Sequence, residues 1–297
     1  MTRSGFAAVV GATNCGKSTL VNALVGQKVS IVTHKAQTTR FKVRGVFERG
    51  ESQVVIVDTP GIFVPRRRLD RAMVRAARSA LDDADAIVHL IDAAHPERAV
   101  AAEIGRMLPR RRERGLLVLN KIDKLPRTAL LPLAAELFAE GEGYVESLMI
   151  SALTGEGVED LARRLAAAMP EGPWLYPAGA RADQPLSRLA SEITREKLFL
   201  RVHQELPYEA NVETTGIEER KDGSVRIDQT IEVERAGQRK IVLGEGGSAL
   251  KAIGIAARSE LAGLIGRPVH LFLHVKVKRG WAEEGALYRN LDLDWNA

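Results

Sequence analysis

The sequence predicts two parts: a mainly parallel six-stranded sheet covered by helices on both faces, followed by a small α+β unit. In the first half, short apolar runs alternate with amphipathic, helix-like segments, the pattern of parallel strands buried between two helical layers. A proline-rich stretch at 169–185 interrupts this rhythm. After it, long alternating strands and a glycine cluster indicate a different architecture.

Six segments of the first half have the composition of strands. In chain order they are FAAVV (6–10), TTRFKVRGVFERG (38–50), QVVIVD (53–58), AIVHLID (86–92), GLLVLN (115–120) and VESLMIS (145–151). The second alternates apolar and polar residues and meets the third at a Gly50-Glu51 turn, so we expect an antiparallel edge strand. Helical segments such as STLVNALVG, RLDRAMVRAARSAL and VEDLARRLAAAM lie between the strands.

The second half begins with a helical pattern, LSRLASEITREKLFLRVHQEL. Two alternating strands follow, joined at Lys221-Asp222-Gly223, a hairpin signal. A helix-like GSALKAIGIAARSELAGLIG and a strand, RPVHLFLHVKV, complete the unit. We therefore place the first domain at 1–170, a semi-stiff linker at 171–185 that allows the domains to reorient, and the second domain at 186–297.

Composition restricts the class of protein. The chain has 297 residues, 45% of them apolar and 27% charged, which fits two globular domains. Its single cysteine, Cys15, allows no internal disulfide, which fits a reducing compartment such as the cytoplasm or simply a protein that needs no disulfides. The start MTRSGF is not an apolar leader and no run of 18 apolar residues occurs, so we expect neither secretion nor a membrane span.

Charge is distributed unevenly along the chain. Residues 1–185 carry 26 Lys and Arg against 21 Asp and Glu, and residues 186–297 carry 17 of each. Positions 235–279, however, hold nine basic residues and only two acidic ones. This stretch predicts a local basic surface suited to nucleic acid, with a solvated surface of scattered charge as the alternative.

The segment GATNCGKST follows a strand and opens a helix. Gly11 and Gly16 bracket four residues ahead of Lys17 and Ser18, the G-x-x-x-x-G-K-S spacing of a phosphate-binding loop. Glycines allow backbone N–H groups to turn toward phosphate oxygens, and the helix N-terminus adds partial positive charge. Lys17 can reach the β- and γ-phosphates, and the Ser18 hydroxyl can ligate Mg²⁺.

Two later segments indicate which base is bound. In N-K-I-D, the Asp123 carboxylate can accept hydrogen bonds from guanine N1–H and its exocyclic amine, whereas adenine offers neither donor. A mismatch of this kind should favour guanine over adenine nucleotides by a factor of roughly 10⁴–10⁵. Asn120 can reach N7 or tie this loop to the phosphate loop. In S-A-L, which ends the next strand, the Ala152 N–H can face guanine O6.

Two further segments predict a switch. D-T-P-G begins at Asp58, which can hold Mg²⁺ through water, and the Gly61 N–H can sense the γ-phosphate. Q-T-T-R at 37–40 lies where a mobile loop is expected, and we choose Thr39 over Thr38 as its Mg²⁺ ligand. Such loops order with the triphosphate and loosen after hydrolysis.

These five segments, in this order, resemble the GTPase domain of the translation-factor class, and QTTR with DTPGI narrows the resemblance to the relatives of Era and the tRNA-modification GTPases. PLSRLASEITREKLFLRVHQELPYEANVE, IEVERAGQRKIVLGEGG and VHLFLHVKVKRGW look like the C-terminal part of the bacterial Era family. The resemblance implies an α/β P-loop GTPase domain followed by a type II KH domain. It further implies a monomeric, cytoplasmic GTPase that binds the 3′ end of small-subunit (16S-type) ribosomal RNA and the pre-small subunit during assembly and maturation.

The motifs and the resemblance assign roles to individual residues. The expected GTP-binding residues are Gly11, Asn14, Cys15, Gly16, Lys17, Ser18, Thr19, Asp58, Gly61, Asn120, Lys121, Asp123, Ser151, Ala152 and Leu153. The expected catalytic residues are Lys17, Thr39, Asp58 and Gly61, and the expected Mg²⁺-holding residues are Ser18, Thr39 and Asp58. In some relatives the position of Asn14 holds a potassium ion, which makes K⁺ a candidate second cofactor.

The chain departs from the family pattern at several positions. Ala12 and Cys15 stand where arginine and valine are usual, and both are small enough to fit. Ile62 follows Gly61, so no side chain at that position can orient the attacking water, and we expect slow intrinsic hydrolysis.

The glycine cluster corresponds to the GxxG loop of a KH domain, which packs against a nucleic-acid backbone. The expected RNA-binding residues are Arg239, Lys240, Gly244, Glu245, Gly246, Gly247, Lys251, Lys276 and Lys278. Glu245 repels phosphate where a basic residue is usual. The expected base-reading groove is lined by Ile241, Leu243, Ile253 and the strand 269–277.

Two other functions remain open at this level. The chain could be a constitutive RNA-binding module with a structural nucleotide, which would show negligible turnover. It could instead be a GTPase of the inner-membrane surface, where family members also occur, using basic residues near 66–78 and 276–279. Liposome co-sedimentation separates this last function from the others.

Overall fold

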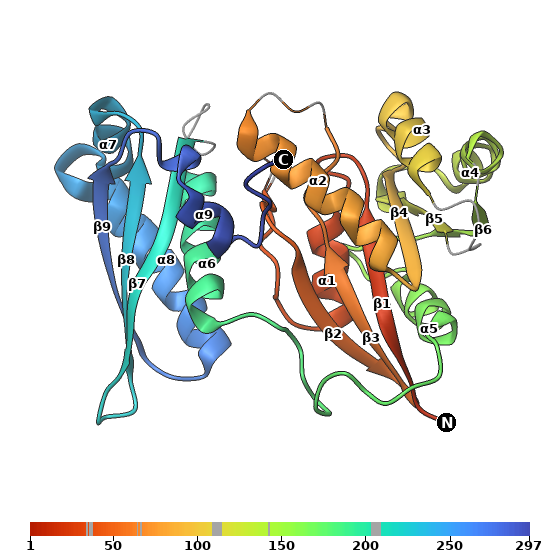
Figure 1. Ribbon diagram of the computed structural model, residues 1–297, viewed down its shortest axis with the longest axis horizontal. Coiled ribbons are helices and arrows are strands. Elements are labelled where there is room, and N and C mark those ends of the chain that lie inside the picture. Colours follow the sequence, from red (N-terminus) through yellow and green to blue (C-terminus); the bar gives the residue numbers. More distant parts are fainter. Residues whose placement is uncertain are drawn as a thin grey trace. The chain divides into compact units, whose positions relative to one another are not determined.

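The structure is a computed structural model that describes residues 1–33, 35, 38–63, 65, 67–108, 115–141, 143–202 and 209–297. Contacts divide the chain into two compact units, each described by itself (Figure 1). The first comprises 1–30, 39–183 and 288–297, and the second comprises 31–38 and 184–287. The predicted domains are continuous in sequence, whereas two short segments, 31–38 and 288–297, pack with the other half of the chain.

The first unit is built on a six-stranded sheet of order β2-β3-β1-β4-β5-β6. Its strands are β1 (Arg3–Val10), β2 (Val43–Arg49), β3 (Ser52–Asp58), β4 (Ala86–Asp92), β5 (Gly115–Asn120) and β6 (Tyr144–Met149). All neighbours pair in parallel except β2 and β3, which are antiparallel. The predicted α/β sheet with an antiparallel edge strand is therefore confirmed. The strand order reverses next to β1, where open sheets of this class hold ligands.

Helices cover both faces of this sheet (Figure 1). Val9 and Val88 pack in one core with α1 (Lys17–Val25) and α5 (Val158–Ala168). Ala8 and Ile87 lie on the opposite face, with α2 (Arg68–Asp83) and α3 (Arg98–Met107). Helix α4 (Arg127–Glu140) adds a third cluster beside β5. Because both faces are buried, the inner parallel strands β4 and β5 are apolar without alternation, whereas the edge strand β6 alternates in burial.

The segment 171–183 is fastened to the edge of the sheet, unlike the spacer that we expected. Gln53 exchanges two side-chain hydrogen bonds with the backbone of Tyr176, each 2.9 Å long. The Val46 N–H of the edge strand β2 donates to the Arg181 carbonyl at 2.9 Å. The Val46 contact satisfies a backbone group that an edge strand leaves unpaired. Prolines stiffen this segment locally, but its path follows the first unit.

The second unit has a three-stranded sheet of order β7-β8-β9 with helices packed against it. Its elements are α6 (Leu186–Arg201), β7 (Ala210–Glu219), β8 (Val225–Val233), α7 (Ala236–Leu243), α8 (Ser248–Ile265) and β9 (Val269–Val277). Strands β7 and β8 form the expected antiparallel hairpin, and Gly223 adopts the positive φ of 81° that its turn requires. Strand β9 pairs in parallel with β8, as the crossover through α7 and α8 demands.

Short helices complete the chain: η1 (Ile122–Lys124), η3 (Glu245–Gly247), η4 (Trp281–Glu283) and α9 (Gly285–Asn290). Within the described part of the chain, no helix has the length and apolarity that crossing a bilayer requires.

Candidate functional site

The phosphate loop connects β1 to α1, and steric constraints require its glycines. A Cβ atom on Gly11 would lie 2.3 Å from the carbonyl oxygen of Leu90. A Cβ atom on Gly16 would lie 2.3 Å from Nδ2 of Asn120, and the Gly16 φ of +102° disfavours any other residue. The loop backbone therefore turns tightly against β4 and β5, with the helix N-terminus at Lys17.

Lys17 and Cys15 are both buried in this loop. The Lys17 ammonium donates to the carbonyl oxygens of Ala12 at 2.8 Å and Gly11 at 3.2 Å, so its charge lies within the turn of the loop. Burial raises the pKa of the Cys15 thiol, although the Lys17 charge opposes the shift. A neutral, buried thiol is a packing group, as expected for the position where valine is usual.

Three hydroxyl groups converge on the Asp58 carboxylate. Ser18 Oγ lies 2.7 Å and Thr39 Oγ1 3.3 Å from Asp58 Oδ2, and the two hydroxyl oxygens are 3.0 Å apart. Ser30 donates to the same carboxylate oxygen at 2.6 Å. Burial raises the pKa of Asp58, while hydrogen bonds from Ser30 and Ser18 act in the opposite direction. The predicted metal-holding side chains thus meet, together with Ser30, which the sequence did not indicate.

This cluster fits a small, hard cation. Asp58 Oδ1 is buried and has no hydrogen-bond partner among the described residues, so one carboxylate oxygen has unused acceptor capacity. Hydroxyl and carboxylate oxygens are the ligands that Mg²⁺ prefers. The Thr38 hydroxyl lies elsewhere, 2.6 Å from that of Thr33. Gln37, the first residue of the Q-T-T-R segment, falls outside the described residues.

Gly61 follows the cluster and approaches the phosphate loop closely. A Cβ atom on Gly61 would lie 2.8 Å from Cγ2 of Thr13. The Ile62 N–H donates to the Gly11 carbonyl at 3.2 Å, and the Ile62 side chain packs in the apolar core with Ala8. The position after Gly61 therefore presents no polar side chain to the site.

Asn120 links the phosphate loop to the segment after β6. Its side chain is 2% exposed, donates to the Cys15 carbonyl at 2.8 Å and accepts from the Ala152 N–H at 2.9 Å. Asn120 was expected either to reach N7 of the base or to connect its loop to the phosphate loop, and the structure shows the second role. The Ala152 N–H, expected to face guanine O6, is already engaged by Asn120, so a base carbonyl would have to share it.

Asp123 lies in η1, where Ser151 Oγ donates to its Oδ1 at 2.6 Å. Its side chain is exposed, so only a bound base would remove the carboxylate from water. Lys121 adopts a positive φ of 64° and donates to the Asn14 carbonyl at 2.7 Å and to Asp92 Oδ2 at 2.6 Å. Thr19 lies in the first turn of α1, and Leu153 is largely exposed.

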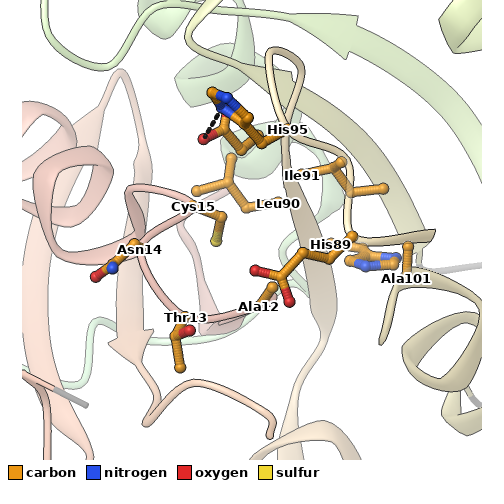
Figure 2. A pocket seen from close by; sticks show the side chains of 11 residues that line it. Ala12, Thr13, Asn14, Cys15, His89, Leu90, Ile91, His95 and Ala101 are labelled. Carbon is orange, nitrogen blue, oxygen red and sulfur yellow. Dashed lines mark ion pairs between the residues drawn. The ribbon is translucent and has the colours of Figure 1, made fainter. Parts of the chain in front are cut away.

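A cavity of about 230 Å³ adjoins the phosphate loop at the carboxyl end of β4 (Figure 2). Figure 2 shows Thr13 and Asn14 on one side and His89 and Ala101 on the other. His89 Nδ1 contacts the Tyr144 hydroxyl at 2.5 Å, and burial lowers the pKa of His89 to about 3. His89 is therefore neutral at pH 7 and is a structural residue of the cavity wall.

The GEGG loop joins α7 to α8 in the second unit. Gly244, Gly246 and Gly247 all have positive φ, at 71°, 56° and 81°. A Cβ atom on Gly244 would lie 2.7 Å from Cβ of Ala249, so the loop folds tightly onto α8. Glu245 is exposed in this loop, where it opposes phosphate.

The basic residues around this loop differ in availability. Four are exposed: Arg239, Lys240, Lys251 and Lys276. Lys278, in contrast, forms ion pairs with Glu232 at 3.0 Å and Glu284 at 2.7 Å, which compete with a phosphate. The prediction that Ile253 lines the base-reading groove is wrong, because Ile253 is 1% exposed and packs in the core with Leu198. Ile241, at 54% exposure, does face solvent.

Family models match both halves of the chain. A model described as a 50S ribosome-binding GTPase matches residues 6–121, and a KH-domain model matches residues 205–282. GTPase Era of Caulobacter vibrioides (strain NA1000) is 57% identical over 99% of this chain and 98% of its own length. This chain belongs to the Era family of GTPases. GTPase Era of Rhizobium meliloti (strain 1021) is 54% identical over 99% of this chain and 94% of its own length.

Solved structures of Era-family proteins agree with this assignment. Era in complex with MgGDPNP and nucleotides 1506–1542 of 16S ribosomal RNA matches with a TM-score of 0.93 and 37% identity, over 98% of this chain and 99% of that one. A variant of Aquifex aeolicus Era bound to GDP·AlF4⁻ matches with a TM-score of 0.92, also at 37% identity and with the same coverage. The chain is therefore a GTP hydrolase with a P-loop GTPase domain and a KH domain.

Sequence reasoning missed several residues that shape the Era-family nucleotide site. Asn22 Oδ1 accepts from the N–H groups of Val29 and Ser30 at 2.8 and 2.9 Å, which places Ser30 beside Asp58. A polar asparagine within the otherwise apolar helical segment STLVNALVG could have indicated this role of Asn22 from the sequence. Asp92 pairs with Lys121. An acidic residue at the end of the buried strand AIVHLID could have indicated it from the sequence.

The basic residues considered for a membrane surface are partly neutralised. Arg75 pairs with Asp294 at 2.9 Å and Arg78 with Glu103 at 3.3 Å. Arg66 lies outside the described residues. No observation on the described surface favours membrane binding over the other functions.

Proposed function

We propose that this chain is a GTP-dependent switch that binds the 3′ end of small-subunit ribosomal RNA and acts, as a cytoplasmic monomer, in assembly of the small ribosomal subunit. The observation that carries the proposal is the presence, in one chain, of the assembled nucleotide site and a KH unit with an ordered GEGG loop. The relative with a TM-score of 0.93 was solved with MgGDPNP and 16S ribosomal RNA bound together, which supports the same pair of ligands here.

Mg²⁺ is the proposed cofactor of the nucleotide site. Ser18 and Thr39 would hold the ion directly, and Asp58 would hold it through water, consistent with its unpartnered Oδ1. When bound, Mg²⁺ neutralises charge on the phosphate oxygens. Lys17 adds a second positive charge, and the Gly61 N–H would report on the γ-phosphate. These four side chains and one amide are the proposed hydrolytic machinery.

Slow intrinsic hydrolysis follows from the position of Ile62. Its side chain is buried in the core, so it cannot orient a water molecule. Another group must take that role, supplied by a partner or by a bound cation. Asn14 would hold K⁺ for this purpose, and equal hydrolysis rates in Na⁺ and K⁺ buffers would exclude that part of the proposal.

The proposed RNA surface is the GEGG loop with the exposed basic residues beside it. Backbone N–H groups of the loop would contact phosphates, while Arg239, Lys240, Lys251 and Lys276 supply positive charge. Ile241 offers apolar contact to bases. Lys278 has a smaller part because two carboxylates already neutralise it.

Filter binding tests the switch directly. RNA of 16S nucleotides 1506–1542, the segment bound by the relative, is titrated with the full chain in GTP-analogue and GDP states. We expect affinities that differ by at least about 5-fold, a typical coupling between two sites. A shuffled RNA of equal length is the control for charge alone. Equal affinities in the two states would reject gating, and negligible turnover with small subunits present would favour the constitutive RNA-binding module.

A further inference from the structure

Of the three hydroxyl groups that converge on Asp58, that of Ser30 has no part in the proposed metal site. Ser30 Oγ donates to Asp58 Oδ2 at 2.6 Å, whereas the distances from this oxygen to Ser18 Oγ and Thr39 Oγ1 are 2.7 and 3.3 Å. Ser18 and Thr39 are the proposed Mg²⁺ ligands, and a switch threonine loosens after hydrolysis. Ser30 is therefore a donor that can stay on Asp58 in every nucleotide state.

The position of Ser30 is fixed by helix α1. Asn22 Oδ1 accepts from the N–H groups of Val29 and Ser30 at 2.8 and 2.9 Å, and Asn22 Nδ2 donates to the Ser30 carbonyl at 2.7 Å. Ser30 is 3% exposed, so water has little access to its hydroxyl. Asn22 lies on α1, the helix that begins at Lys17 of the phosphate loop. The helix that carries the phosphate loop thus also holds the Ser30 hydroxyl in place.

The contact determines which oxygen of the Asp58 carboxylate stays available. Hydroxyl groups occupy Oδ2, whereas Oδ1 is buried and has no hydrogen-bond partner among the described residues. The terminal torsion of an aspartate is broad, so a fixed donor is needed to keep each oxygen in one place. Hydrogen bonds of this kind orient the groups that hold a metal and strengthen its binding.

We propose that Ser30 is a positioning residue for Mg²⁺: its hydroxyl, held in place by Asn22, fixes Asp58 Oδ2 and leaves Oδ1 as the acceptor for water bound to the metal. The inference rests on the proposed Mg²⁺ site. Ser30 acts through Asp58 and is not itself a ligand. Because its contact involves neither Thr39 nor a γ-phosphate, it should support the GTP and GDP complexes alike.

Ser30→Ala in the full chain removes this donor and leaves the other two hydroxyl groups on Asp58. Binding of a fluorescent GTP analogue and of fluorescent GDP is measured while Mg²⁺ is titrated, and again in excess EDTA. The matched control is Ser4→Ala, near the start of β1, since Ser4 is 8% exposed and its hydroxyl donates to the Pro173 carbonyl at 2.6 Å. Urea unfolding verifies the fold of each variant.

We expect Ser30→Ala to raise the Mg²⁺ concentration at half-maximal nucleotide binding about tenfold, an effect typical of removing a hydrogen-bond partner of a metal-holding group. The shift should be equal for the GTP analogue and GDP, and the affinities in EDTA should not change. Ser4→Ala should leave all of these values as in the parent chain. If Ser30 had only a structural role, the affinities with and without Mg²⁺ would fall together and the Mg²⁺ requirement would stay constant.

The double variant Ser30→Ala with Asp58→Asn tests whether Ser30 acts through Asp58. At a fixed Mg²⁺ concentration, Ser30→Ala should cause no further loss of nucleotide affinity in the Asp58→Asn chain, because the carboxylate that it orients is gone. A further loss there would overturn the inference, as would an unchanged Mg²⁺ requirement in the folded single variant.

Ser30→Cys is the second variant and remains decisive if Ser30→Ala fails to fold. A thiol fills a similar space but is a weak donor, so the Mg²⁺ requirement should rise by a smaller factor. An unchanged requirement in this folded variant overturns the inference and leaves the metal site standing. A parent chain that binds nucleotide equally well with and without Mg²⁺ rejects the metal site itself, and the inference with it.

Discussion

Replacing Asp123 with asparagine should change which base the site accepts. A carboxylate accepts hydrogen bonds from guanine N1–H and its 2-amino group, whereas a carboxamide has only one acceptor and sets an N–H₂ group against the 2-amino group. Ser151 donates to Asp123 Oδ1 at 2.6 Å, so it would keep the amide oxygen on its own side and leave Nδ2 toward the base. Xanthine carries a carbonyl at position 2 and would pair with that Nδ2.

The magnitude follows from the number of bonds exchanged. A hydrogen bond to a charged group contributes about 1.5–3 kcal/mol. The variant loses one such bond and sets its N–H₂ group against the 2-amino donor of guanine. Together these changes should weaken GTP binding by about 3–4 kcal/mol, or roughly 10²–10³-fold in Kd. Because xanthine nucleotides gain a bond in the same exchange, we expect XTP to bind the Asp123→Asn chain more tightly than GTP.

Equilibrium dialysis of GTP, XTP and ATP against the parent and variant chains measures this exchange. Asp123 is exposed, so the free energy of unfolding should change by no more than about 0.5 kcal/mol. Asp82→Asn, at an exposed position of α2, is the matched control and should bind all three nucleotides as the parent does. A variant that still prefers GTP to XTP would refute the assignment of Asp123 to the base.

Three other predictions follow from contacts at the two sites. Asn120→Ala leaves a buried N–H and a buried carbonyl without their partner, so urea unfolding should show a loss of about 2–4 kcal/mol. Burial raises the pKa of Asp58, so in the nucleotide-free chain its contribution to stability is lost as pH rises above the unfolded carboxyl pKa. Asp58→Asn should remove that loss in denaturation measured across pH, while abolishing the Mg²⁺ dependence of GTP binding. Lys251→Ala should lower the salt-dependence slope of RNA binding by about 1, whereas Lys278→Ala should change it less.

Each of these predictions has a contradicting outcome. An Asn120→Ala chain as stable as the parent would mean that its two bonds are replaced by water. If the free energy of unfolding of the parent chain rose with pH over a range where that of Asp58→Asn is constant, the pKa of Asp58 would be lowered on folding, opposite to the direction inferred here. Equal salt slopes for the two lysine variants would show that the pairs of Lys278 open on RNA binding.

The geometry of the phosphate loop was predictable because its determinants are local. Two glycines, a lysine and a serine between an apolar strand and a helix admit few backbone paths, and the loop follows the predicted one. The alternation of buried strands and helices likewise predicted the sheet, and the polar alternation of 38–50 predicted its antiparallel edge. In each case a few neighbouring residues carry the signal.

Contacts between distant segments were not predictable in this way. Ser30 beside Asp58, Asp92 beside Lys121 and the fastening of 171–183 to the edge strand all join residues far apart in sequence. The burial of Ile253 was missed because an apolar residue near a groove and one in the core have the same local signature.

By itself, the amino-acid sequence determined the family, the architecture of each unit and the three predicted metal-holding residues that converge at the nucleotide site, because steric limits and periodicity act over a few neighbouring positions. Only the tertiary structure decided that the Thr39 hydroxyl joins Ser18 and Asp58, while the Thr38 hydroxyl lies beside that of Thr33. Adjacent threonines are equivalent in local chemistry, and what separates them is which buried partners the rest of the chain brings within hydrogen-bond distance.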